Sequence, residues 1–214
     1  MIHAYDKCYL EKARTALGRM LDFAVYDLKY DITFFFDLFI QSGTATRFEN
    51  GDFELLVGMS GIELAYYVLE QADIEHSRIK PNPSFDRSEE FWTGWALAYY
   101  QWDTSLHFAE IVRYIPICDI MALYSPYHEM DIRQFVDKMN LLYKSAKPGT
   151  NLKLFRQKAN LTQRELAELS GIPLRTLQQY EQQQKNINKA QARYLVILAK
   201  ILCCKVEDLM EKIS

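Results

Sequence analysis

Apolar positions recur at helical spacing through the first part of the chain. Between Asp6 and Tyr30, and again between Ser60 and Gln71, they lie three or four residues apart. This period predicts amphipathic helices or, in the first stretch, a broken pair. Ser88 precedes a third such run and can cap it, because its hydroxyl can accept a hydrogen bond from an otherwise unpaired amide. We expect further helices at 106–114, 116–124 and 132–144.

One apolar run leaves two possibilities open. Ile32 to Ile40 is apolar nearly all round and is rich in Phe and Ile, which are common in strands. Its neighbours are helical and no partner strand is evident, so we interpret it as a helix capped by Asp31. With this assignment the sequence predicts an all-α protein.

Two short helices around a glycine are expected near the C-terminus. Thr162 can cap the first of them, and Glu165, three residues later, completes a capping box. Gly171 supplies the positive φ of a sharp reversal, and Pro173 suits the first turn of the next helix, where its missing amide hydrogen is not needed. One apolar face of the first helix would be formed by Leu166, Ala167 and Leu169.

The second of these helices has an outward polar face. Ile172, Leu177 and Tyr180 should face the core, because they share one side of the helix and its entry. Four side chains are then left toward solvent: Leu174, Arg175, Gln178 and Gln179. Long polar side chains in this position are what reading the base edges of DNA requires.

Charge and aromatic content divide the chain near residue 144. The net charge of −3 combines 12 Lys+Arg and 22 Asp+Glu in residues 1–143 with 13 and 6 in residues 144–214, balances of −10 and +7. Of the 29 Phe, Tyr and Trp residues, 26 precede residue 144. We expect two domains, 1–145 and 150–214, joined by a short hinge. The basic domain suits a polyanion, whereas the acidic one is suited to a protein partner or a small molecule.

An aromatic stripe marks the helix that follows Ser88. Trp92, Trp95, Tyr99 and Trp102 fall at i, i+3, i+7 and i+10, on one side of a helix. Such a stripe must be covered by packing between helices, by a partner peptide or second protomer, or by a small ligand. Core packing is favoured, and a partner or dimer surface is the next alternative.

Residues typical of catalytic and metal sites are scattered. The four cysteines lack CxxC or Cys/His ligand spacing, and we expect them to be buried free thiols. His128-Glu129 resembles the start of a zinc-protease motif, but the second histidine is missing. No nucleophile has a nearby base. We therefore predict no enzyme, no metal and no cofactor. Without a membrane-spanning run or a signal peptide, we expect a cytoplasmic protein.

The second domain combines its signals in one pattern. Leu152-Lys153-x-x-Arg156 is followed by Leu161-Thr162-Gln163-x-Glu165-Leu166-Ala167, Gly171-Ile172, Leu177-x-x-Tyr180-Glu181 and a closing Leu-Ala-x-x-Leu helix. This pattern resembles the phage-repressor-like helix-turn-helix family, the XRE or Cro/C1 type, from Leu152 to Met210. The resemblance implies a five-helix domain, following an aromatic-rich helical domain, and double-stranded DNA as the partner.

The resemblance also implies roles for individual residues. The four outward residues of the second helix would enter the major groove, where Arg pairs with guanine, Gln with adenine and Leu174 with a thymine methyl group. Gln163 would bind a backbone phosphate at a helix N-terminus. Residues after the second helix would contact the sugar-phosphate chain: Lys185, Asn186, Asn188 and Lys189.

Two further positions bear on the domain's architecture. In family members, the residues that correspond to Arg156 and Glu181 form a partly buried ion pair between the first and third helices of the domain. The family commonly has Gly two residues after this glutamate, where Gln183 stands.

Two functions fit these observations. The first is a sequence-specific transcriptional regulator, a dimeric repressor that binds a pseudo-palindromic operator and dimerises through the acidic domain. The alternative is an antitoxin that neutralises a partner toxin through its N-terminal domain and represses the shared operon through its C-terminal domain.

Overall fold

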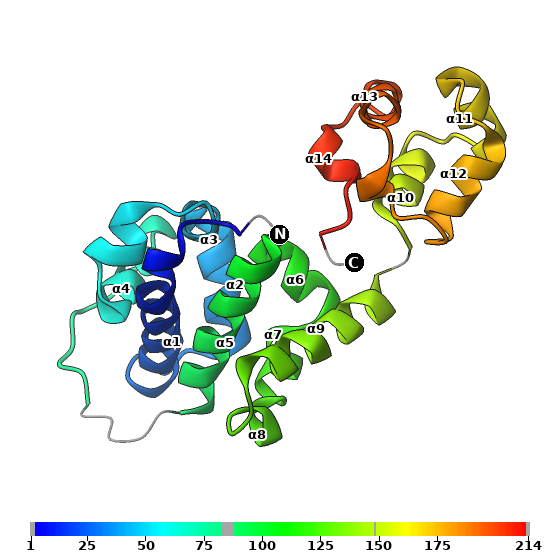
Figure 1. Cartoon of the computed structure of the whole chain (residues 1–214). Coiled ribbons are helices and arrows are strands. Elements are labelled where there is room, and N and C mark those ends of the chain that lie inside the picture. Colours follow the sequence, from blue (N-terminus) through cyan, green and yellow to red (C-terminus); the bar gives the residue numbers. More distant parts are fainter. Residues whose placement is uncertain (1–2, 83–87, 148, 213–214) are drawn as a thin grey trace. The chain divides into compact units, whose positions relative to one another are not determined.

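The computed structural model describes residues 3–82, 88–147 and 149–212, and within these ranges it contains helices and no strand (Figure 1). The chain divides into two compact units, Met1–Lys144 and Ser145–Ser214. The expectation of an all-α protein is confirmed, including the helical state of the Phe-rich run after Asp31.

The first unit holds nine α-helices within its described residues, with two short helical turns. Its elements in chain order are the 3-10 turn η1 (Lys7–Tyr9), α1 (Leu10–Tyr26), α2 (Ile32–Gln41), α3 (Thr44–Glu49), the π-helical turn η2 (Glu54–Gly58), α4 (Gly61–Gln71), α5 (Glu89–Thr104), α6 (Phe108–Tyr114), α7 (Ile117–Met121), α8 (Tyr124–Tyr127) and α9 (Ile132–Ala146).

Polar caps begin three of these helices where the sequence predicts them. Asp31 accepts hydrogen bonds from two amides of α2, at 2.9 and 3.0 Å. Ser60 Oγ accepts from the Glu63 amide at 3.3 Å, while the Glu63 carboxylate accepts from the Ser60 amide at 2.7 Å. Ser88 Oγ accepts from an α5 amide at 3.0 Å. Each bond satisfies an amide that the first helical turn cannot pair.

Close backbone contact joins α1 to its neighbours α4 and α5. A Cβ atom at Gly94 of α5 would lie 2.6 Å from the Leu17 carbonyl oxygen of α1. One at Gly61 of α4 would lie 2.5 Å from the Ala16 carbonyl oxygen. Since no Cβ fits at either position, glycine allows both helices to pack directly on the backbone of α1, which runs dark blue beside α5 in Figure 1.

A phenylalanine cluster fills the core beside these helices. Phe36, Phe39, Phe48 and Phe108 are buried, and their rings meet at centroid distances of 5.6 to 6.1 Å. Aromatic pairs at such distances, several of them edge-to-face, stabilise a core beyond the area that they bury. The cluster draws α2, α3 and α6 together.

Several elements differ from the sequence-based expectations. The helix expected at 116–124 is divided into α7 and α8. The helices α3 and η2 were not predicted, because runs of five or six residues are too short to show a period. The hinge, expected at residues 145–150, begins with the last two residues of α9, and residue 148 lies outside the described residues.

The cysteines correct another expectation. All four are free thiols, but Cys8, Cys118 and Cys203 are exposed and Cys204 is only partly covered. The expected burial is therefore wrong. The general preference of cysteine for the interior does not decide these positions.

Candidate nucleic-acid interface

The second unit contains five α-helices within its described residues, coloured from yellow-green to red in Figure 1. They are α10 (Asn151–Lys158), α11 (Gln163–Ser170), α12 (Leu174–Glu181), α13 (Ala192–Ile201) and α14 (Val206–Leu209), with the 3-10 turn η3 (Ile187–Lys189) after α12. Leu152, Leu166, Leu177 and Leu198 are fully buried in its core.

The turn between α11 and α12 has the expected construction. Thr162 Oγ1 accepts from the Glu165 amide at 3.2 Å, and the Glu165 carboxylate accepts from the Thr162 amide at 2.7 Å. This backbone hydrogen bond from Thr162 lowers the pKa of Glu165. Gly171 has φ +65°, so the predicted left-handed turn is confirmed. Pro173 stands one residue earlier than expected, as the last residue before α12.

Leu169 does not join the apolar face of α11, which corrects that expectation. Its side chain is 61% exposed, whereas Leu166 is buried and Ala167 packs at the edge of the core. The position beside Leu166 is taken instead by Ser170, which is buried and donates from Oγ to the Leu166 carbonyl at 2.6 Å. The buried stripe follows the i, i+4 direction, and this leaves Leu169 outside it.

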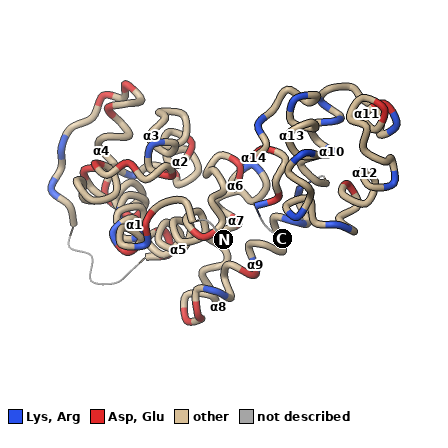
Figure 2. The backbone as a smooth tube through the Cα atoms, turned by 45° about the horizontal axis from the view of Figure 1, so that its top comes forward, with Lys and Arg blue, Asp and Glu red and all other residues tan. Residues whose placement is uncertain are grey.

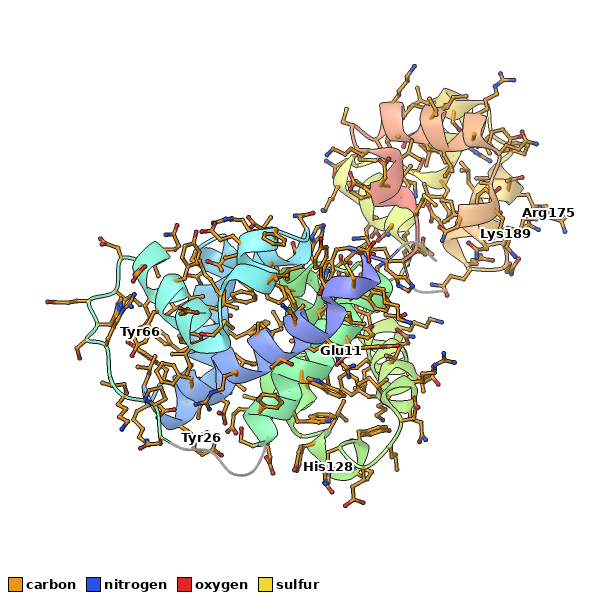
Figure 3. All side chains as sticks on the ribbon, turned by 60° about the vertical axis from the view of Figure 1, so that its left-hand side comes forward. Glu11, Tyr26, Tyr66, His128, Arg175 and Lys189 are labelled. Atoms are coloured by element: carbon orange, nitrogen blue, oxygen red, sulfur yellow. The ribbon has the colours of Figure 1, made fainter. Side chains whose placement is uncertain are left out.

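The helix α12 presents the outward face that the sequence predicts, with different degrees of exposure. Leu177 and Tyr180 are buried. Arg175 is exposed and its side chain extends away from the unit in Figure 3. The other three outward residues are half-buried: Leu174, Gln178 and Gln179. Arg175 is thus the most accessible side chain of the predicted base-reading set.

A polar network fixes α12 against α10 and α11. Arg156 donates to the Glu181 carboxylate through Nε at 2.6 Å and Nη2 at 2.9 Å, so the ion pair suggested by the resemblance is present. This hydrogen bond raises the pKa of Arg156. Gln163 Nε2 donates to Glu181 Oε2 at 2.7 Å, and Gln178 Nε2 donates to Gln163 Oε1 at 3.4 Å. The Gln163 amide group, which has two hydrogens, donates one of them in this network.

The loop after α12 carries the other predicted phosphate contacts. Lys185, Asn186 and Lys189 are exposed, and Figure 3 labels Lys189 together with Arg175. Gln183 has φ +59°, so it adopts the left-handed backbone that the family commonly gives to glycine. The loop therefore turns as glycine would allow, at the energetic cost of a side chain in that region.

Asn188 has a different environment from its neighbours in this loop. It is partly buried, and both ends of its side-chain amide are paired with the main chain of Glu211. Sequence reasoning did not include Glu211. No local signal marks this contact, because the two residues are far apart in the sequence.

The four residues of the aromatic stripe in the first unit differ in their exposure to solvent. Trp92 and Trp102 are only 7% and 4% exposed, so core packing accounts for them and they are not surface residues. Trp95 and Tyr99 are half-buried, and the Arg14 guanidinium lies 3.3 Å from the Trp95 ring centroid. Two of the four stripe residues, Trp95 and Tyr99, therefore remain partly accessible.

A pocket adjoins this stripe within the first unit. Its volume is about 170 Å³, and its lining is formed by Phe91, Trp92, Trp95, Tyr124 and His128. The rings of Tyr124 and His128 stack at 4.1 Å, and Tyr124 meets Trp92 edge-on. Aromatic faces of this kind suit an apolar or planar group.

Acidic and basic residues are distributed differently in the two units. Figure 2 shows Asp and Glu on most helices of the first unit and Lys and Arg at several places on α10 to α13. Within the described ranges, no three His, Cys, Asp or Glu side chains come together to hold a metal ion. No helix there has both the length and the apolar character that crossing a membrane requires.

Comparisons with known proteins bear on the second unit alone. Residues 152–209 match the family model described as Helix-turn-helix. The first unit matches no family model. Neither the curated proteins nor the solved structures contain a significant match to the chain.

Proposed function

Because residues 152–209 form a helix-turn-helix domain of the DNA-binding, transcription-regulating XRE type, we propose that the chain is a sequence-specific repressor that acts as a homodimer. The observation that carries the proposal is the outward face of α12, with Arg175 extended into solvent beside Leu174, Gln178 and Gln179. This face has the dimensions and the hydrogen-bonding groups that the major groove admits.

In this proposal the rest of the domain positions α12 on the duplex. Lys185, Asn186 and Lys189 meet phosphates on one side, and Gln163 meets a phosphate with its remaining amide hydrogen. The family is a regulatory DNA-binding one, not a catalytic one. A single short helix reads few bases, so two copies are needed for a long site, with half-sites about one helical turn apart.

Replacement of Arg175 tests the base-reading role. We expect Arg175→Ala to remove the preference for a duplex selected from a random pool by the wild-type chain, a loss of about 1–3 kcal/mol. Binding to random duplex should be largely retained. The measurement is a titration of both duplexes at fixed salt, because phosphate contacts depend strongly on salt.

A matched control separates base reading from charge. Arg193 is also exposed but lies on α13, so Arg193→Ala removes the same charge away from the proposed face. It should weaken both duplexes alike. Equal losses on selected and random duplex for Arg175→Ala would contradict the base-reading role.

A second function is favoured by the half-exposed aromatics of the acidic unit. In this alternative the chain is an antitoxin whose first unit holds a toxin at Trp95, Tyr99 and the neighbouring pocket. We expect a small protein to copurify from the native host with the wild type and with Arg175→Ala, but not with Tyr124→Ala. A lone homodimer in all three preparations would contradict the antitoxin role and leave the repressor.

A further inference from the structure

Met210 and Glu211, near the end of the described residues, are held by hydrogen bonds on two sides. Toward the loop after α12, the Glu211 amide donates to Asn188 Oδ1 at 2.8 Å, and Asn188 Nδ2 donates to the Glu211 carbonyl at 2.6 Å. Toward the start of the unit, Glu211 Oε1 accepts from the Asn151 amide at 2.6 Å. Asn151 Nδ2 donates to the Met210 carbonyl at 2.7 Å. We call Met210–Glu211 the clasp.

A charged pair completes the second side of the clasp. Lys147 Nζ donates to Glu211 Oε2 at 3.0 Å. The two side chains are only 8% and 18% exposed, so water screens the pair poorly. Lys147 directly follows the last residue of α9. The clasp therefore connects the chain segment that leaves α9 with the loop that carries the proposed phosphate contacts.

The loop itself has two points of attachment. At its start, the Lys185 amide donates to the Gln179 carbonyl of α12 at 3.1 Å. At its end, Ile187 is buried and Asn188 is paired to the clasp. Lys185 and Lys189 are exposed on either side of this second attachment. Loss of the clasp would leave Ile187 as the attachment at this end and would loosen the segment that presents both lysines.

We propose that Asn188 and Glu211 are positioning residues for DNA binding, which hold Lys185 and Lys189 in register with the phosphates, and that Lys147 couples this register to the end of α9. The proposal rests on the proposed DNA-binding function. It gives Asn188 an indirect role in place of the direct phosphate contact that the resemblance implies. A loop that is already ordered loses less conformational entropy when it binds the duplex, and this favours affinity.

A double-mutant cycle distinguishes the two roles of Asn188. The variants are Asn188→Ala, a chain ending at Leu209 and their combination, each titrated with the duplex selected by the wild-type chain. We expect Asn188→Ala to weaken binding about tenfold, as the loss of one or two neutral hydrogen bonds would. The shortened chain also loses the bonds to Asn151 and Lys147, so it should be at least tenfold weaker. The combination should be no weaker than the shortened chain alone, because the contact of Asn188 with the clasp is already broken there.

Gln184→Ala is the matched control, since Gln184 lies in the same loop and bonds only to Gln182 there. We expect it to change affinity less than twofold. If Asn188 contacted phosphate directly, its replacement would remain costly in the shortened chain, and the combination would bind about tenfold more weakly than the shortened chain alone. That additive result would overturn the positioning role.

Two conservative changes test the coupling without shortening the chain. Lys147→Met should weaken binding more than Lys205→Met, which removes the same charge from an exposed residue of the same unit. Lys147→Met and Glu211→Gln should also speed amide hydrogen exchange at residues 185–189. Equal effects of the two lysine changes, or unchanged exchange, would overturn the coupling.

Amide hydrogen exchange is measured without DNA, so it tests whether the clasp orders residues 185–189 even if the proposed function is wrong. A wild-type chain that selects no duplex from the pool would contradict DNA reading. Faster exchange at residues 185–189 in Asn188→Ala would still support the clasp in that case, and unchanged exchange would overturn it.

Discussion

The two units differ in whether all their buried polar side-chain atoms have hydrogen-bond partners. In the first unit the hydroxyl of Tyr5, Glu90 Oε2 and Gln101 Oε1 are buried without a hydrogen-bond partner among the described residues. In the described part of the second unit, no buried side-chain nitrogen or oxygen lacks one. Both units have apolar cores, but in the described part of the second unit the buried polar side-chain atoms are all paired, as in the bonds between Arg156 and Glu181. Directional bonds fix one geometry, as reading DNA requires.

Replacement of Arg156 should cause the largest loss of stability, and this loss should occur in the second unit. Arg156→Met leaves the Glu181 carboxylate buried without its bidentate partner, which costs about 3–5 kcal/mol of unfolding free energy. We expect the exchange-protected core of the second unit to be lost. Tryptophan emission should change little, because all three tryptophans lie in the first unit.

The double replacement Arg156→Met with Glu181→Met is the control for this prediction. Apolar side chains of similar volume often replace a buried pair at little cost, so stability should largely return. If the double variant were as unstable as the single one, the loss would have to come from packing or from the Leu161 carbonyl that Arg156 also binds.

A smaller effect, confined to the first unit, is expected from Gly94→Ala. The added Cβ would meet the α1 backbone, which cannot move aside as a flexible side chain can, at a cost of about 1–3 kcal/mol. The urea midpoint followed by tryptophan emission should fall. Gly58→Ala is the matched control, because a Cβ there meets only ordinary contacts. A similar fall in both variants would show that α1 and α5 need no close approach.

Lowering the pH should cause the smallest loss of stability, and this loss should occur in both units. Backbone hydrogen bonds from the cap residues lower the pKa of Glu63 in the first unit and of Glu165 in the second. A lowered folded-state pKa contributes stability that is present above the unfolded value, 4.5, and is lost as the pH falls through the folded value.

Unfolding of each unit at a series of acidic pH values measures this loss. Glu63→Gln should reduce the pH dependence of the first unit alone, and Glu165→Gln that of the second alone. An unchanged pH dependence in either variant would show that its capping box does not contribute to the pH dependence of that unit's stability.

The sequence predicts the features that depend on neighbouring residues. The caps at Asp31, Ser88 and Thr162, the helix start at Ser60 and the turn at Gly171 are all confirmed, since each depends on a bond or a dihedral within a few residues. The inward positions of α12 are also confirmed. Local chemistry was sufficient for these.

Features set by the distant neighbours of a side chain could not be predicted in this way. Leu169 is exposed although it was expected on the apolar face of α11, and Trp102 is buried while Trp95 of the same stripe is half-buried, because burial depends on which element packs beside each residue. The pairing of Asn188 with Glu211 joins residues that no spacing rule relates. For the candidate site, the outward face of α12 could be predicted from the sequence, but the pairing of the following loop with the clasp could not.

The left-handed backbone at Gln183 has a consequence for how this position tolerates mutation. The residue is exposed, and an exposed position ordinarily accepts most side chains. With φ +59°, however, glycine relieves the backbone, while β-branched residues such as valine and isoleucine fit worst. In a saturation scan, position 183 would therefore favour glycine first and then asparagine and aspartate, whose short side chains tolerate this backbone, although the position is exposed.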